Sequence, residues 1–219
     1  MVGRHEDIAR VAVVDLDGTL LRANSFRIYV RCGLRVLARR RKAVSLLRVL
    51  YGVLRRKSGF ISHNRYREIC ARHIGFGPEV LRAVAAEAAC VRSQAVARFI
   101  EERRAEGYDV LLATAALEAY AAVLWDGPMV ASSMKHGIVV DDCRGARKLE
   151  LVLEALGGRT PAYILSDHRA DLPLLRHVAQ HGGKAVLVNP SAAELRFFRE
   201  LKPSELFDVE LLLDGSEPR

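Results

Sequence analysis

The chain has 219 residues, of which half are hydrophobic, and a formal net charge of +8. This length allows one domain, or one core with a sizeable insertion, and the composition excludes collagen-like, repetitive and disordered chains. No run of about 18 apolar residues occurs, which excludes a membrane-spanning helix, and the first ten residues lack the apolar stretch of a signal peptide, so we expect none.

Cysteine usage indicates a reducing compartment. The four cysteines form no C-x-x-C pair and no zinc-binding spacing: Cys32, Cys70, Cys90 and Cys143. We therefore expect four reduced thiols in a cytoplasmic protein.

The first predicted element is a buried strand at residues 10–15, RVAVVD, because the run is short, apolar and β-branched. Residues 24–95 then have a helical pattern, in which we read three or four helices and no strand. Gly33 and Gly52 are weak breaks in this pattern, and residues 75–78, GFGP, are a stronger one.

The predicted helices at 24–95 overlap an intensely basic segment. From Arg22 to His73 there are fifteen Lys or Arg residues and a single acid, Glu68, an excess of 14 positive charges. Since the whole chain carries +8, the remainder carries −6. Such asymmetry indicates an anionic partner or surface, or two modules with different roles.

After residue 95, helices and strands alternate. We predict helices at 93–106, 115–125, 146–156, 172–180 and 192–200, and extended segments at 108–113, 129–131, 138–140, 162–165 and 185–188; the tail at 205–213 is ambiguous. This alternation predicts a parallel α/β sheet covered on both faces, in which ligands bind beyond the carboxyl ends of the strands.

Two acidic pairs follow predicted strands. Asp15 and Asp17 stand two residues apart after the first strand, in DLDGTL, and two like charges so close call for a cation, for which oxygen ligands favour magnesium. Asp167 and Asp171 follow the strand AYIL, and Asp167 can reach the same metal. The alternatives are an ordinary Asp-rich turn for the first pair and a helix-start carboxylate for Asp171.

Two further polar residues lie between these pairs along the chain. Thr114 can donate a hydroxyl hydrogen bond to a phosphate oxygen, and Lys148 can offset phosphate and carboxylate charge. Taken alone, each is also compatible with an ordinary strand end or helix face.

These four motifs, in this order, resemble the haloacid dehalogenase superfamily, in particular its phosphoserine-phosphatase-like branch (subfamily IB). They are DLDGTL with Asp15 and Asp17, LLATA with Thr114, CRGARK with Lys148, and ILSDHRAD with Asp167 and Asp171. The resemblance implies a Rossmann-like core formed by residues 1–22 and 96–219, and an inserted helical cap domain at 23–95.

The resemblance also implies a mechanism. Asp15 would form an aspartyl-phosphate, and Asp17 would act as general acid and then general base. Mg²⁺ would be bound by Asp15, the backbone carbonyl of Asp17, and Asp167, with Asp171 supporting the site and Thr114 and Lys148 binding phosphate. Asp17 argues against dehalogenase activity, because the dehalogenases of this superfamily lack this acid.

Departures from the family pattern concern the substrate. Phosphoserine phosphatases place an acid nine residues after the nucleophile to bind the substrate amine, but here that position is Asn24, so phosphoserine is disfavoured.

Other departures concern the loops around the site. The loop after Thr114 lacks its usual proline, and His168 follows Asp167 as a partly solvated loop histidine or a substrate contact. The segment between Trp125 and Cys143 is short, which predicts a trimmed β-hairpin.

The basic cap leaves several partners open. We expect the substrate to be a small or a lipid phosphomonoester, and the cap to be able to associate peripherally with an anionic membrane, such as the inner membrane surface. The alternatives are a solvated basic face, or a membrane- or nucleic-acid-binding module on the same fold. No protein partner is implied.

Overall fold

The computed structural model describes residues 8–201 and 207–214, and its core is a seven-stranded sheet. The strand order is β4-β3-β2-β1-β5-β6-β7, and all neighbours are parallel except β3 and β4. The strands are β1 (Ile8–Val14), β2 (Asp109–Leu117), β3 (Met129–Lys135), β4 (Ile138–Asp141), β5 (Thr160–Ser166), β6 (Lys184–Val188) and β7 (Val209–Leu212). The predicted α/β class with a mostly parallel sheet is confirmed.

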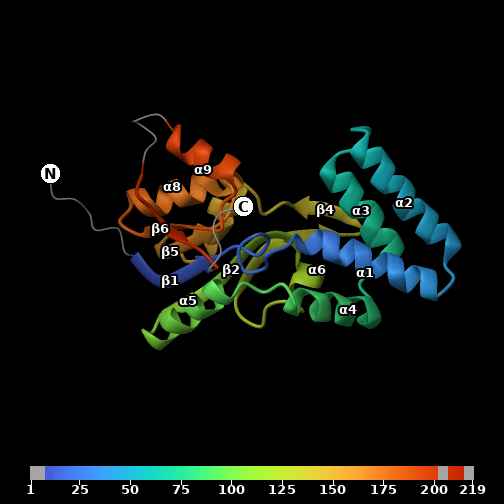
Figure 1. The fold of residues 1–219 in the computed structure, drawn as a ribbon, viewed down its shortest axis with the longest axis horizontal. Coiled ribbons are helices and arrows are strands. Elements are labelled where there is room, and N and C mark those ends of the chain that lie inside the picture. The colour runs from blue at the N-terminus through green and yellow to red at the C-terminus, as the bar shows by residue number, and fades with distance from the viewer. Residues whose placement is uncertain (1–7, 202–206, 215–219) are drawn as a thin grey trace.

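Helices cover both faces of this sheet, as Figure 1 shows. Strand side chains alternate between the two faces, so Val14 packs in one apolar cluster with Val96 of α5 (Gln94–Ala105), whereas Val13 packs in the other with Leu174 of α8. The second face carries α7 (Ala146–Ala155), α8 (Leu172–Gln180) and α9 (Ala192–Arg199). These helices match the predicted ones to within one or two residues.

Four helices lie between β1 and α5, and Figure 1 shows them together at one end of the molecule. They are α1 (Ser25–Arg39), α2 (Ala43–Lys57), α3 (His63–Ile74) and α4 (Pro78–Ala89). Helix α1 contacts the other three, and its buried Tyr29 stacks on Tyr120 with ring centroids 5.1 Å apart. We propose that residues 23–95 act as the cap domain on a core made of 1–22 and 96–219; parts of that core lie outside the described residues.

The two glycines expected to weaken the first cap helices lie inside them. Gly33 is in α1 and Gly52 in α2, and both helices continue through these positions. A Cβ atom at Gly33 would lie 2.3 Å from Cγ2 of Ile74. The glycine therefore lets α1 and α3 pack closely, and the prediction of breaks was wrong.

The predicted helix at 115–125 was also wrong. Strand β2 continues to Leu117, and only Glu118–Ala121 form a short helix, α6. The extended backbone is held from outside, because the carbonyl of Ala115 accepts hydrogen bonds from Arg67 (2.6 Å) and Ser132 (2.9 Å). Local alanine content favours a helix, but these tertiary contacts override it.

The β3–β4 hairpin is longer than the two short segments predicted, since β3 continues to Lys135, and β4 contacts α3. The ambiguous tail contains β7, although residues 205 and 206 lie outside the described part. No helix within the described residues is long and apolar enough to cross a membrane.

Candidate active site

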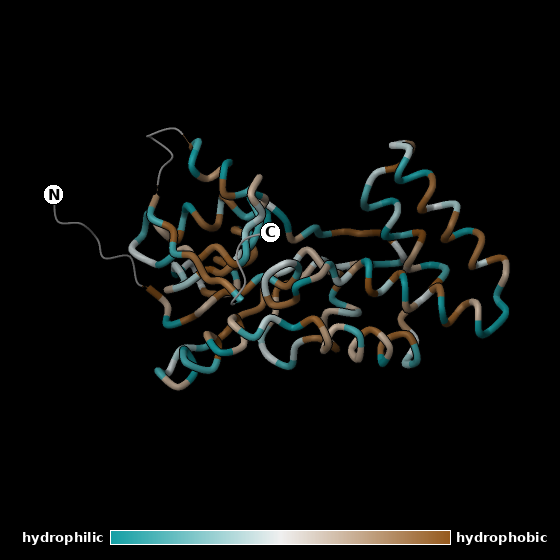
Figure 2. Tube along the Cα trace, in the orientation of Figure 1, coloured by the Kyte–Doolittle hydropathy of each residue, from teal (hydrophilic) through white to brown (hydrophobic). Residues whose placement is uncertain are grey.

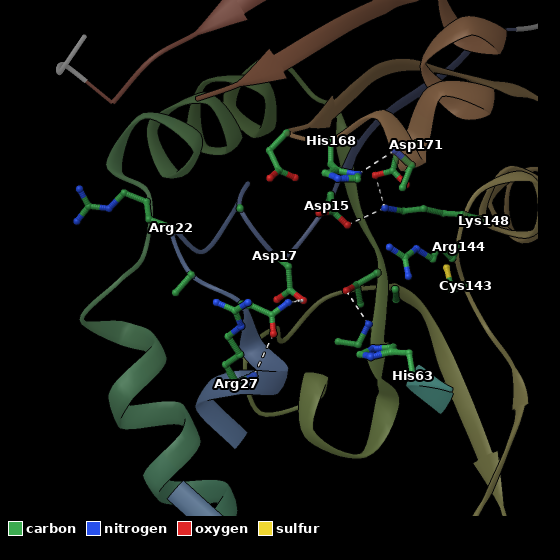
Figure 3. Close-up of a pocket in the computed structure, with 18 of the residues that line it drawn as sticks. Asp15, Asp17, Arg22, Arg27, His63, Cys143, Arg144, Lys148, His168 and Asp171 are labelled. Carbon is green, nitrogen blue, oxygen red and sulfur yellow. Dashed lines mark hydrogen bonds and ion pairs between the residues drawn. The ribbon is translucent and has the colours of Figure 1, made fainter. Parts of the chain in front are cut away.

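The carboxyl ends of β1, β2 and β5 meet at the centre of the sheet, where the strand order reverses direction. Asp15 follows β1, Asp167 follows β5, and Thr114 lies in β2 just before a shift in its pairing with β3. All three line a pocket of about 630 Å³, together with Asp17 and Lys148 (Figure 3). The fold thus brings together residues that are far apart in the sequence, as the sheet rule predicts.

Lys148 is at the centre of a buried ionic network, which Figure 3 shows. Its Nζ atom donates to Oδ1 of Asp15 at 2.6 Å and to Oδ2 of Asp171 at 2.7 Å. The Oγ atom of Ser166 also donates to Oδ2 of Asp171, at 2.8 Å. Lys148 and both carboxylates are buried, so this network fixes the position of the Asp15 side chain.

Asp171 stands at the N-cap position of α8. Although it precedes α8, its side chain makes no capping hydrogen bond, and its carboxylate faces Lys148 and Ser166 instead. Asp171 therefore lies at a helix start, as the alternative has it, and also contacts the cation next to Asp15.

Gly18 permits the loop to fold back onto the end of β5. Its φ is +80°, which favours glycine, and an added Cβ would lie 2.0 Å from Oδ2 of Asp167. This close approach brings the Asp15–Asp17 loop against Asp167. The requirement for glycine is thus both conformational and steric.

Asp17 connects the core to the first cap helix. Its Oδ1 accepts from the backbone N–H of Ser25 at 2.7 Å, and its Oδ2 accepts from Nδ2 of Asn24 at 3.2 Å. Asn24 is also the N-cap of α1, because its Oδ1 accepts from the backbone N–H of Arg27. Both ends of the Asn24 amide are therefore engaged within the protein.

The site holds more buried carboxylates than cations. Burial raises the pKa of Asp15 well above its ordinary value, and the charges of Asp171 and Asp167 add to the rise. Burial also raises the pKa of Asp17, and that of Asp167 to about 7. Although burial disfavours its charged form, Lys148 has a raised pKa because it pairs with Asp15 and Asp171, so it remains an ammonium.

The donor chemistry fits a hard divalent cation. Within the described residues, no group of three or more His, Cys, Asp or Glu side chains is arranged to hold a metal. The carboxylate of Asp17 faces Ser25, which leaves the carboxylates of Asp15 and Asp167 and the carbonyl of Asp17 as oxygen donors. Magnesium commonly takes only one or two protein carboxylates and completes its shell with water and phosphate, so this smaller set fits Mg²⁺.

The mouth of the pocket is cationic. Arg22, Arg27, Arg56 and Arg144 line it along with His63, and the pKa of His63 is lowered by burial and by the nearby arginines. Such a rim attracts phosphate and repels ammonium groups.

His168 lies on a loop and is exposed. Its Nδ1 accepts from the backbone N–H of Ala170, and its Nε2 lies 3.6 Å from Oε1 of Glu194. It also lines the pocket. The expectation of a partly solvated loop histidine is confirmed.

Sequence reasoning missed Arg67 of α3. Its guanidinium is buried, and it donates to Oδ1 of Asp142 at 3.0 Å and to the carbonyl of Ala115, one residue after Thr114. Within a segment containing fifteen basic residues, nothing in the sequence distinguishes this one. Only the packing of the cap against β2 and β4 reveals it.

The model of one protein family, haloacid dehalogenase-like hydrolase, matches residues 12–176, well over half of the chain. A comparison with curated proteins found no match. Among solved structures, a protein of unknown function from Bordetella pertussis Tohama I has 20% identity, a TM-score of 0.68, and coverage of 93% of this chain and 99% of that chain.

Two further structures share the fold at lower identity. A hydrolase of the same family from Salmonella enterica serovar Typhi has 15% identity, a TM-score of 0.56, and coverage of 87% of this chain and 65% of that chain. A substrate-bound phosphoserine phosphatase has 12% identity, a TM-score of 0.52, and coverage of 94% of both chains. At these identities the structures establish the fold alone.

Proposed function

Because the chain belongs to the haloacid dehalogenase-like hydrolase family, we propose that it is a magnesium-dependent phosphomonoester phosphatase with Asp15 as its nucleophile. The supporting observation is the buried contact between Asp15 and Lys148 in a pocket that arginines also line. Asp171 accepts a second hydrogen bond from Lys148 and so helps to fix its position. Such a fixed carboxylate can reach a phosphorus atom that the cationic groups have drawn in.

In the first step, an oxygen of Asp15 attacks phosphorus, and the bond from phosphorus to the leaving oxygen breaks. Asp17 donates a proton to that oxygen; its raised pKa favours the protonated carboxyl that this step requires. Lys148 and the hydroxyl of Thr114 stabilise the charge on the phosphoryl oxygens. The products are an alcohol and an aspartyl-phosphate on Asp15.

In the second step, Asp17 accepts a proton from water as the water oxygen attacks phosphorus. The bond between phosphorus and Asp15 breaks, which releases inorganic phosphate and restores both carboxyl groups. The hydrogen bonds that Asp17 accepts from Ser25 and Asn24 orient it for both proton transfers. Because these partners belong to the start of the cap, cap position and acid–base catalysis are linked.

Asp15, Asp167 and the carbonyl of Asp17 would hold the magnesium ion, and Asp171 would support the site through Lys148. When bound, the ion neutralises carboxylate charge and charge that develops on the phosphoryl group.

The test is phosphate release from an aryl phosphate. Activity should disappear after thorough chelation and return when Mg²⁺ is added. Undiminished hydrolysis by metal-free protein would contradict the metal requirement, and no hydrolysis with Mg²⁺ present would contradict the phosphatase proposal.

We also propose that the cap docks on an anionic membrane surface, at the cytoplasmic inner face. One side of α2 exposes apolar residues that recur at helical spacing: Val44, Leu47, Leu50, Tyr51 and Leu54. Phe60, just beyond α2, is 75% exposed. Figure 2 shows hydrophobic positions recurring along this outermost helix.

The basic residues around this apolar side of α2 favour an anionic partner. Exposed Arg48, Arg55 and Lys57 flank it, and they have no carboxylate partner within the described residues. A second copy of the chain would bring like charges together, and nucleic acid would leave the apolar residues in water. An anionic bilayer satisfies both the apolar and the cationic parts.

A further inference from the structure

A second groove, larger than the catalytic pocket, runs through the cap. Its volume is about 840 Å³, and it lies between α1, the C-terminal half of α2 and the start of α3. Its apolar lining consists of Phe26, Val30 and Leu34 on α1, with Val53 on α2 and Tyr66 on α3. This groove is a different surface from the outward-facing apolar side of α2.

The groove and the catalytic pocket are continuous. Four residues line both cavities: Asn24, Arg27, Arg56 and His63. Asn24 donates to the carboxylate of Asp17, so the groove begins next to the catalytic acid. From there it follows α1 as far as Arg35, which at the helical rise corresponds to about 16 Å.

The charges of the groove are graded along its length. At its far end, Arg31 and Arg35 both pair with Glu87 of α4. At its junction with the catalytic pocket, Arg27 and Arg56 have no carboxylate partner within the described residues. Uncompensated positive charge is therefore concentrated where the headgroup of a ligand would enter the catalytic pocket.

A matching ligand must be anionic at one end and apolar along its length. A small polar phosphate ester would fill only the catalytic pocket and leave the apolar groove without a ligand. An alkyl chain in the groove would remove its own methylene groups from water, and each methylene buried there strengthens binding.

We propose that this groove binds the alkyl chain of an amphiphilic phosphomonoester, while Arg27 and Arg56 hold its anionic headgroup against the catalytic pocket. The inference rests on the proposed phosphatase function and specifies its substrate class as long-chain rather than small polar phosphate esters. No covalent chemistry occurs in the groove.

The test is a binding measurement that does not need turnover. Calorimetric titration of the full chain with dodecylphosphonate and with methylphosphonate, both non-hydrolysable, should give at least a 100-fold tighter Kd for the long chain. Val53→Trp, which fills the groove, should weaken dodecylphosphonate binding at least tenfold. Ala86→Trp, at an exposed position of α4 outside the groove, is the matched control and should bind like wild type.

Equal affinity of the wild-type chain for the two phosphonates would overturn the inference, whatever Val53→Trp does to folding. Tighter binding of dodecylphosphonate that Val53→Trp leaves unchanged would also overturn it, because the chain would then lie elsewhere. Hydrolysis of aryl phosphate is measured separately. If the chain hydrolyses aryl phosphate but binds both phosphonates equally, only the proposed role of the groove is refuted. If it does not hydrolyse aryl phosphate, the proposed phosphatase function is refuted.

Discussion

Asp15 is held by a single buried cation, and its proposed role depends on its charge and nucleophilicity rather than on its shape. Asp15→Asn keeps the size of the side chain and one acceptor oxygen for Lys148. We expect this substitution to lower kcat for aryl phosphate by at least about a thousandfold, measured as phosphate release with Mg²⁺ present. An unchanged circular dichroism spectrum is the control, and near-normal kcat would refute the mechanism.

Asp167 gives a pH dependence to the stability of the metal-free protein. Its pKa rises from 3.8 to about 7, chiefly through burial. The folded state therefore binds more protons than the unfolded state between these values, and the free energy of unfolding falls as the pH rises from 4 to 7. The raised pKa values of Asp15 and Asp17 act in the same direction.

Thermal unfolding of metal-free protein at pH 5 and pH 8 measures this effect. We expect lower stability at pH 8, by about 1–3 kcal/mol from Asp167, and a smaller difference in Asp167→Asn. Added Mg²⁺ should stabilise the wild type most at pH 8, where the carboxylates are ionised. A Tm of the metal-free wild type that rises between pH 5 and pH 8 would contradict the prediction.

We predict that phosphoserine is a poor substrate, because Asn24 stands where an acid would bind its amine. The amide of Asn24 is engaged by Asp17 and by the N–H of Arg27, and the cationic mouth of the pocket repels an ammonium group. We expect kcat/KM for phosphoserine to be at least tenfold below that for 3-phosphoglycerate, its hydroxyl-for-amine analogue. If phosphoserine is the better of the two, the inference from Asn24 is wrong.

At the scale of single elements, the buried side chain of Arg67 makes the shortest hydrogen bonds between α3 and the core, and Asn64 and Glu68 add longer ones. Arg67→Met keeps most of the volume but removes the donors to Asp142 and Ala115. We expect the free energy of unfolding in urea to fall by about 2–3 kcal/mol, because a buried ionic partner is lost. Arg65 lies on the same helix, is exposed and pairs with Glu68. Arg65→Met should therefore lower the free energy of unfolding by less than about 1 kcal/mol. Equal costs would refute a fastening role for Arg67.

At the scale of the whole molecule, the charge excess and the exposed side of α2 act together. We expect the chain to sediment with anionic vesicles at low salt, less so at high salt, and not with neutral vesicles. Leu54→Asp, at a position 62% exposed on α2, should reduce sedimentation severalfold. Leu211→Asp, at a position 55% exposed on β7, is the matched control. Absence of binding to anionic vesicles at low salt would leave a solvated basic face.

Most of the fold was predictable because the signals were local. Apolar β-branched runs of strand length and helices of ordinary length alternate after residue 95, and this pattern fixes a parallel sheet. The expectation that Asp15, Thr114 and Asp167 meet followed from the sheet rule, since each lies near the carboxyl end of a strand. The helical character of residues 24–95 followed from periodicity in the same way.

Only the tertiary structure decided the contacts that cross between these segments. Residues 115–117 are extended because Arg67 and Ser132 bind the carbonyl of Ala115, and neither residue is near in sequence. The sequence by itself determined which residues carry charge and which are apolar. The packing of α1, α2 and α3 decided which apolar residues of α2 face the groove and which face solvent. Helical periodicity defines an apolar face of a helix, but it does not define the element that packs against that face.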